Sequence, residues 1–210
     1  MQARISPLFW DQQWSRWGTI GFLFFLPFQP LSPAHLDEDL WRSKEFQLAY
    51  AKLQKRLPSE FRWQAKTIAK TVHENAERHN LSVSLILAVM ETESSFQPRA
   101  ISKAGAMGLL QVLPETAEEV ARLNSISYEG PHELWNPVKN IEIGTAYLAY
   151  LKKRFSHQHL YLAAYNFGPT AIHRRVKNGD RWLENTKFYV NKIQGLEKGN
   201  KIRMALYGQI

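Results

Sequence analysis

The chain has 210 residues, 44% of them hydrophobic, which is enough for one domain of ordinary size with a packed core. Its formal net charge of +8 suits a polyanionic partner such as nucleic acid, anionic lipid or an acidic polymer. There are no cysteines, which excludes disulfides, thiol catalysis, cysteine-ligated metals and a lipidated cysteine anchor.

Residues 1–34 have the features of a targeting segment. Arg4 and Arg16 precede an apolar run from Trp17 to Phe28. The run has the length of a signal-peptide apolar region and is short for a membrane span of roughly 20 residues. Small residues at Ser32-Pro-Ala34 would suit cleavage, although prolines crowd the site. We expect export to the periplasm or cell envelope; a buried or uncleaved interfacial helix is the alternative.

Helical periodicity and capping residues predict that the remainder of the chain is all-α, because no sustained two-residue alternation indicates a strand. The predicted helices cover approximately residues 40–57, 60–79, 83–94, 114–123, 136–155, 160–165, 169–177 and 184–196. Residues 97–113, which contain Gly105 and Gly108, lack a clean period and are expected to form an ordered loop.

One predicted helix combines an apolar body with an acidic end. Val83–Met90 is apolar enough to be buried, yet Glu91 and Glu93 follow directly. Carboxylates at the edge of an apolar core cost free energy unless they are paired or used. Residues two apart on a helix point about 200° apart, so these two glutamates cannot flank one scissile bond and at most one faces a cleft.

Four motifs, in order along the chain, resemble the soluble lytic transglycosylase (SLT, goose-type-lysozyme-like) domain family. They are Glu93-Ser94-x-Phe96 followed by Ser102, Gly105-Ala-x-Gly-Leu-Leu-Gln111, Ala163-Ala-Tyr-Asn-x-Gly168, and Tyr189-Val190. The resemblance covers roughly residues 66–195 and implies a lysozyme-like lobe around a cleft. We therefore expect an SLT-type catalytic domain at 66–198, an N-terminal helical extension at 35–65 and a C-terminal tail at 199–210.

The resemblance implies that Glu93 is a general acid and base that cleaves the β-1,4 bond between N-acetylmuramic acid and N-acetylglucosamine without water. Glu93 would protonate the glycosidic oxygen while the neighbouring N-acetyl group stabilises the sugar carbon. The carboxylate would then take the proton of the muramoyl C6 hydroxyl, leaving a 1,6-anhydromuramoyl end. This requires apolar surroundings that raise the pKa of Glu93, for which Leu87, Val89, Met90 and Phe96 are available. Glu91 would then be a solvated or ion-paired residue.

The distribution of acidic residues agrees with one catalytic acid. No aspartate lies between Asp39 and Asp180, and most intervening glutamates fall in predicted first turns or loops, where structural or solvated roles are favoured. A goose-type lysozyme, in which water attacks, is the alternative enzyme. A non-catalytic wall-binding accessory of a secretion or pilus machine is the alternative from another class. A nucleic-acid-binding function is a further alternative, and only the positive net charge supports it.

The resemblance assigns substrate contacts to further residues: Ser102, Gln111, Tyr165, Asn166 and Tyr189. The serine would hold the glutamate or the substrate acetamido group, the glutamine would bind sugar, and the late tyrosine would line the cleft near the acid. The tyrosine of the third motif would reach substrate, whereas the asparagine beside it would order the turn. Structural alternatives are a loop-stabilising serine, a helix-stop asparagine and core aromatics.

The expected partner is the peptidoglycan glycan strand, whose lactyl-peptide carboxylates are acidic. Positive charges are spread along the chain instead of forming a block, so no nucleic-acid partner is expected. No cofactor or metal is expected, because His157 and His159 have no third ligand nearby in sequence. We expect a monomer and leave a cell-envelope complex open.

Overall fold

The structure is a computed structural model that describes residues 33–179 and 184–206. The predicted all-α fold is confirmed, since these residues form helices joined by loops and contain no strand. None of the described helices is both long and apolar enough to cross a membrane. All but the last two residues of the predicted targeting segment lie outside the described residues.

The elements, in order, are α1 (Pro33–Arg42), α2 (Lys44–Arg56), η1 (Ser59–Gln64), α3 (Ala65–His79), α4 (Val83–Ser94), α5 (Pro114–Asn124), η2 (Pro131–Trp135), α6 (Pro137–Arg154), α7 (Gln158–Phe167), α8 (Pro169–Asn178) and α9 (Glu184–Leu206).

Helix boundaries near the N-terminus differ from the predicted ones. The helix predicted over 40–57 is divided at Ser43, whose hydroxyl accepts a hydrogen bond from the Phe46 N–H and so caps α2. The helix predicted from residue 60 begins as the 3-10 segment η1, and regular α-helix starts only at Ala65. A second 3-10 segment, η2, lies in what was predicted to be a plain loop.

The last helix is longer than predicted. The periodic pattern indicated an end near Leu196, but α9 continues to Leu206 and includes most of the predicted C-terminal tail. Its extra turns are anchored from outside the helix. Asn200 is fully buried, and its amide donates to the Ser84 carbonyl oxygen of α4 at 3.0 Å. Because this contact bridges 116 residues, local sequence reasoning could not reveal it.

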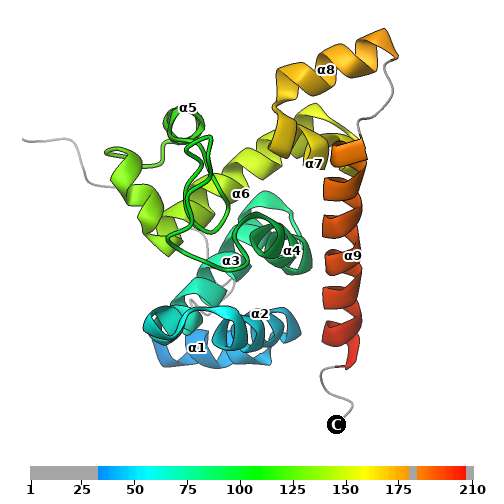
Figure 1. Cartoon of the computed structure of the whole chain (residues 1–210). Helices are drawn as coiled ribbons and strands as arrows, with labels where there is room; N and C mark the ends of the chain where they lie inside the picture. The colour runs from blue at the N-terminus through cyan, green and yellow to red at the C-terminus, as the bar shows by residue number, and fades with distance from the viewer. Residues whose placement is uncertain (1–32, 180–183, 207–210) are drawn as a thin grey trace, which may run out of the picture.

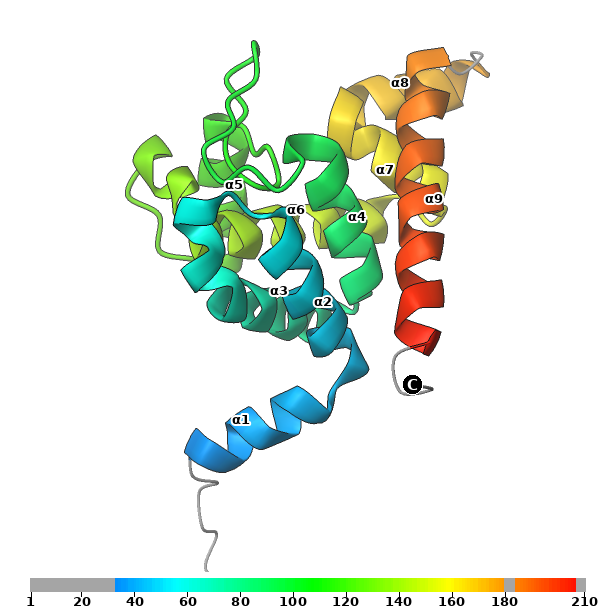
Figure 2. The ribbon, with the colours of Figure 1, turned by 60° about the horizontal axis from the view of Figure 1, so that its bottom comes forward.

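Helix α4 lies at the centre of the fold. Every residue from Val83 to Met90 is buried, and α4 packs against α9, α2 and α3. Figures 1 and 2 show α9 along one flank of the molecule with α4 beside it. Phe46, Leu48, Ala49 and Leu53 of α2 belong to the same core, so this part of the predicted extension packs within the domain. Helix α1 projects away from the body (Figure 2).

The ordered loop after α4 is attached to the core by a buried asparagine. Asn140 of α6 is fully buried; its side-chain oxygen accepts from the Leu110 N–H at 2.8 Å, and its amide donates to the carbonyl oxygens of Met107 and Leu134. From the other side, the Ser94 hydroxyl donates to the Leu109 carbonyl oxygen at 2.8 Å. The loop is therefore bound to the acidic end of α4 and to α6 together.

Candidate active site

The site is built where the end of α4 meets α9. Glu93 lies in the last turn of α4, beyond the apolar residues that bury the rest of the helix. Tyr189 is carried by α9, is itself buried, and its hydroxyl donates a hydrogen bond to Glu93 Oε1. The contact joins residues 96 positions apart, so the packing of α4 on α9 creates it.

Burial dominates the electrostatics of Glu93. Loss of hydration raises the pKa of Glu93 to about 7, against smaller opposing effects from the Tyr189 hydrogen bond and the positive charge of Lys192. Met90 and Phe96, on either side in sequence, are fully buried. A carboxyl group in these surroundings carries a proton for a large fraction of the time near neutral pH, which is the requirement for a general acid.

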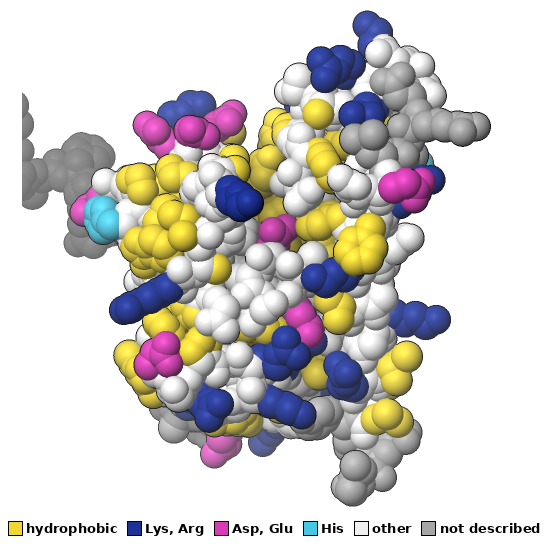
Figure 3. All heavy atoms as spheres, in the orientation of Figure 1, with side chains coloured by type: hydrophobic (Ala, Val, Ile, Leu, Met, Phe, Trp, Pro, Cys, Tyr) yellow, Lys and Arg dark blue, Asp and Glu magenta, His cyan; other side chains and the backbone are white. Residues whose placement is uncertain are grey.

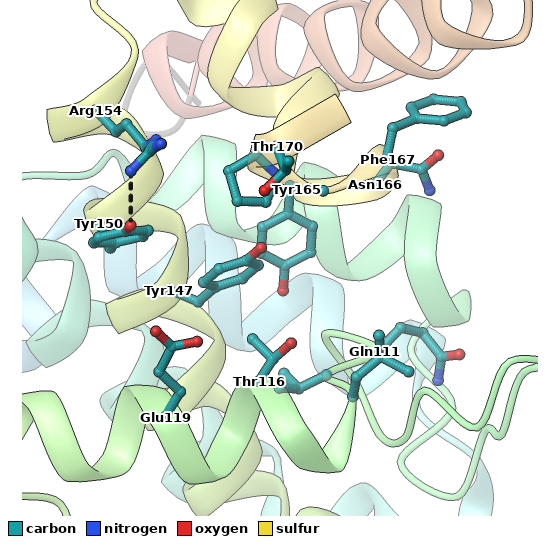
Figure 4. A pocket seen from close by; sticks show the side chains of 14 residues that line it. Gln111, Thr116, Glu119, Tyr147, Tyr150, Arg154, Tyr165, Asn166, Phe167 and Thr170 are labelled. Carbon is teal, nitrogen blue, oxygen red and sulfur yellow. Dashed lines mark hydrogen bonds between the residues drawn. The ribbon is translucent and has the colours of Figure 1, made fainter. Parts of the chain in front are cut away.

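A cleft of about 520 Å³ lies on this side of the molecule (Figure 4). It is bounded by the end of the ordered loop, by α5 and α6, and by the junction of α7 and α8. The space-filling view shows the face hollowed near its centre between hydrophobic side chains (Figure 3). Tyr165 connects the cleft with the acid. It lines the cleft, and its pKa is raised first by burial and then by the charge of Glu93.

Three of the residues that sequence analysis selected line this cleft: Gln111, Tyr165 and Asn166. The amide of Gln111 donates to the carbonyl oxygens of Gly108 and Ala100, which leaves its side-chain oxygen without a partner among the described residues. Tyr165 donates its hydroxyl to the Leu110 carbonyl oxygen at 2.8 Å. Asn166 is exposed at the end of α7. These three residues line the cleft, whereas Tyr189 contacts Glu93. Tyr165 connects the two groups, because the charge of Glu93 acts on both tyrosines.

Ser102 is placed differently. It is exposed, and its hydroxyl accepts a hydrogen bond from the Ala106 N–H at 3.0 Å while its backbone pairs with the same residue. These contacts lie within the loop and match the loop-stabilising alternative. A contact between Ser102 and Glu93 or substrate stays a prediction.

Sequence analysis did not select the other end of the cleft. Tyr147, Tyr150 and Arg154 of α6 line it, with Thr116 and Glu119 of α5 opposite (Figure 4). The rings of Tyr147 and Tyr165 are 5.3 Å apart and join the two ends into one surface. The spacing of three and four residues between Tyr147, Tyr150 and Arg154 along α6 was the available signal.

Among the described residues that line the cleft, Glu119 carries the one carboxylate, and Glu93 is not one of these lining residues. The charge of Glu119 contributes to the raised pKa of Tyr147, whereas the charge of Glu93 acts on Tyr165 and Tyr189. Glu119 is exposed, unlike Glu93. Among the described residues, no cluster of three histidine or acidic side chains could hold a metal ion.

Glu91, the other acidic residue of the α4 end, is ion-paired. Its carboxylate lies 2.6 Å from Lys52 Nζ and 3.4 Å from an Arg56 guanidinium nitrogen, both on α2. This agrees with the ion-paired role expected for Glu91 and gives the two glutamates different partners, α2 for Glu91 and α9 for Glu93.

The profile of the Transglycosylase SLT domain family matches residues 70–188, more than half of the chain. The chain belongs to this family. The match spans Glu93 and the cleft residues, and it stops just before Tyr189. The SLT resemblance seen in the four sequence motifs is thus confirmed.

Named relatives of this SLT chain are murein transglycosylases. Membrane-bound lytic murein transglycosylase C of Histophilus somni is 39% identical over 135 residues, covering 60% of this chain and 36% of the relative. Soluble lytic murein transglycosylase of Salmonella typhimurium is 36% identical over 120 residues, covering 56% of this chain and 18% of the relative. The SLT chain therefore corresponds to about a third or less of the length of these relatives.

Solved structures share the fold. An inactive mutant of the lytic transglycosylase Slt from Pseudomonas aeruginosa matches with a TM-score of 0.60 and 28% identity, over 65% of this chain and 24% of that one. The 70 kDa soluble lytic transglycosylase of Escherichia coli matches with a TM-score of 0.61 and 23% identity, over 81% of this chain and 29% of that one. The predicted lysozyme-like SLT fold is confirmed.

Proposed function

We propose that the protein is a peptidoglycan lytic transglycosylase that cleaves the MurNAc–GlcNAc β-1,4 bond and forms 1,6-anhydromuramoyl ends. The observation that carries the proposal is a largely buried carboxyl group, Glu93, which has a pKa of about 7 and acts electrostatically on Tyr165 in the wall of a cleft of an SLT domain. At neutral pH such a group exists in both protonation states, and one residue must serve in both during this reaction.

The reaction follows from these two states. Protonated Glu93 donates its proton to the glycosidic oxygen as the bond to the muramoyl C1 breaks, and the substrate N-acetyl group stabilises the positive carbon. The Glu93 carboxylate then takes the proton of the C6 hydroxyl, whose oxygen bonds to C1. Tyr189 favours the carboxylate through its hydrogen bond, so it assists the proton donation of the first step and opposes the proton uptake of the second.

The cleft residues supply the binding surface in this proposal. Gln111 presents a free side-chain oxygen to sugar hydroxyls, Tyr165 and Asn166 form the wall next to it, and Tyr147 extends the aromatic surface. Amino-sugar chains offer both apolar ring faces and hydroxyl groups, which suits a wall of tyrosines with a few convergent polar groups. Ser102 would contribute through the conformation of its loop.

Product analysis on purified sacculi tests the proposal. The wild-type protein should release muropeptides with anhydro ends, detected by mass spectrometry as products one water lighter than hydrolytic ones. Glu93→Gln should lower the rate at least a hundredfold, because a glutamine can neither donate nor accept the proton. Release at the normal rate by Glu93→Gln would refute the assignment.

A goose-type lysozyme activity would give a different result. Reducing ends in place of anhydro ends would indicate attack by water. Glu119→Gln identifies the source: a loss as large as that of Glu93→Gln, together with reducing ends, would mean that two carboxylates act across the cleft. No release by the wild-type protein would favour a non-catalytic wall-binding role.

We further propose that the protein acts in the cell envelope, where its substrate is located. Residues 1–34 would direct export, with the helices of the extension from residue 35 and the SLT-type domain at 66–198 folding outside the cytoplasm as a monomer. N-terminal sequencing of the protein recovered from the envelope fraction would test cleavage near residue 34. Analytical ultracentrifugation would test the monomeric state.

A further inference from the structure

We propose that Lys52 of α2 is a positioning residue for the catalytic pair, Glu93 and Tyr189. It does not contact either residue; it acts by joining the two helices that carry them. The inference rests on the proposed function of Glu93 and adds to it a role for segments outside the residues matched to the SLT family, 70–188.

One ammonium group makes both connections. Lys52 Nζ lies 2.6 Å from Glu91 Oε2 on α4, two residues before Glu93, and donates to Asn200 Oδ1 on α9 at 2.7 Å. The Asn200 amide returns to α4 by donating to the Ser84 carbonyl oxygen at 3.0 Å. Helices α2, α4 and α9 are therefore connected through Lys52 and Asn200, and both of these lie outside the family match.

The connection is shielded from water. The side chains of Lys52 and Glu91 are 10% and 16% exposed, and Asn200 is fully buried. Burial reduces screening, so the geometry of this ion pair is enforced far more strongly than that of a surface pair. Lys52 and Arg56 also lie 5.7 Å from the ring centroid of Phe96, where the chain leaves α4.

This arrangement bears directly on catalysis because the Glu93–Tyr189 hydrogen bond also spans α4 and α9. A small shift of one helix along the other would lengthen that bond and misplace the proton donor. Stability alone is a poor explanation for such a group, since a buried ion pair replaced by apolar or neutral side chains often leaves stability unchanged. The Lys52–Glu91 ion pair therefore serves to fix the position of α4 relative to α9.

Three variants test the inference by comparing melting temperature with kinetics on sacculi. Glu91→Gln leaves the Lys52 ammonium group without its carboxylate, and Lys52→Met leaves Glu91 with only Arg56, whose guanidinium nitrogen is 3.4 Å away. Both should therefore lower the melting temperature. The double variant Lys52→Met/Glu91→Gln should recover part of that temperature, because both charges of the pair are removed while the buried Asn200 Oδ1 still lacks its donor. It should nevertheless keep kcat roughly ten- to a hundredfold below wild type with KM little changed, because the reacting groups are misplaced while the cleft is intact.

Two further variants provide controls. Lys55→Met removes an exposed charge from the same helix and should change neither kcat nor melting temperature. Lys52→Arg keeps a cation at this position and should retain part of the kcat that Lys52→Met loses. A double variant with wild-type kcat would overturn the inference, whatever its melting temperature, because the catalytic pair would then be positioned without Lys52.

Hydrogen exchange provides a readout that does not depend on activity. In the double variant, amides of the last turn of α4 and of α9 around Tyr189 should exchange faster than in wild type, while those of α6 should not change. Unchanged exchange at α4 and α9 would overturn the inference even if the protein is an active transglycosylase. Faster exchange there would show that Lys52 orders the α4–α9 contact, whether or not product analysis supports the proposed activity.

Discussion

Tyr189 donates a hydrogen bond to a carboxyl group that must begin the proposed reaction protonated. The bond favours the carboxylate and therefore holds the pKa of Glu93 below the value that burial alone would give. Met90 and Phe96, which flank Glu93 in sequence, are fully buried and limit the access of water to it. At the residue scale, the site thus balances two opposing effects on one proton.

Removal of the Tyr189 hydroxyl should shift the pH–rate profile. In Tyr189→Phe the pKa of Glu93 rises further, so the fall in kcat at alkaline pH should move to higher pH. Tyr165→Phe is the matched control, because its hydroxyl donates to the Leu110 carbonyl oxygen and not to Glu93. Equal displacement of the two profiles, or none for Tyr189→Phe, would contradict this account.

The same burial should make Glu93 costly to stability at neutral and higher pH. In the unfolded chain Glu93 loses its proton near its ordinary pKa of 4.5, whereas the native protein retains it until about pH 7. The native state binds more protons between these values, so the contribution of Glu93 to stability falls as pH rises through this window and levels off above it. Calorimetry should find Glu93→Gln increasingly more stable than wild type from pH 5 to pH 8; a constant difference would contradict the shift.

At the element scale, the loop between α4 and α5 depends on close contact with α6. Gly108 has a φ of +78°, and a Cβ there would lie 2.5 Å from the Leu134 carbonyl oxygen and closer still to the Asn140 amide. Gly105 has a similar φ of +83°, but a Cβ there would meet nothing within 4 Å. A comparison of the two glycines therefore separates the cost of an unfavourable φ from the cost of a steric clash.

Alanine at these two positions should give unequal losses. Gly105→Ala should cost about 1 kcal/mol of unfolding free energy, from the unfavourable φ alone. Gly108→Ala should cost at least about 2 kcal/mol more, because it displaces Asn140 and the Leu134 backbone. Urea unfolding measures the loss of unfolding free energy in both variants. Equal losses would mean that the close approach at Gly108 adds no steric cost.

At the scale of the whole molecule, the charge of +8 should affect binding more than chemistry. Basic side chains are spread over the cleft face instead of forming one patch (Figure 3). Binding to intact sacculi, which are acidic, should weaken several-fold as salt is raised, since exposed charges are screened beyond about 10 Å at 0.1 M. Binding to peptide-free, uncharged amino-sugar chains should depend little on salt. Sedimentation of sacculi with bound protein measures binding to sacculi, and calorimetric titration measures binding to the peptide-free chains.

Local sequence patterns were sufficient for most elements because caps and periodicity act within one turn. Ser82 caps α4 by accepting from the Leu85 N–H, and Asn136 caps α6 by accepting from the Val138 N–H. The same reasoning failed at the end of α9, where burial of Asn200 against α4 extends the helix beyond its own pattern.

The sequence by itself determined an all-helical SLT domain and a single acidic residue worth testing, because apolar periodicity, capping residues and ordered motifs are all local properties. Only the tertiary structure decided which groups contact that acid and which residues complete the cleft. The Tyr189 hydroxyl, the cleft wall of Tyr147 and Tyr150, and the Lys52 connection are brought together by helix packing across long stretches of chain. The pKa of Glu93 also depends on that packing, because burial is a property of the whole fold.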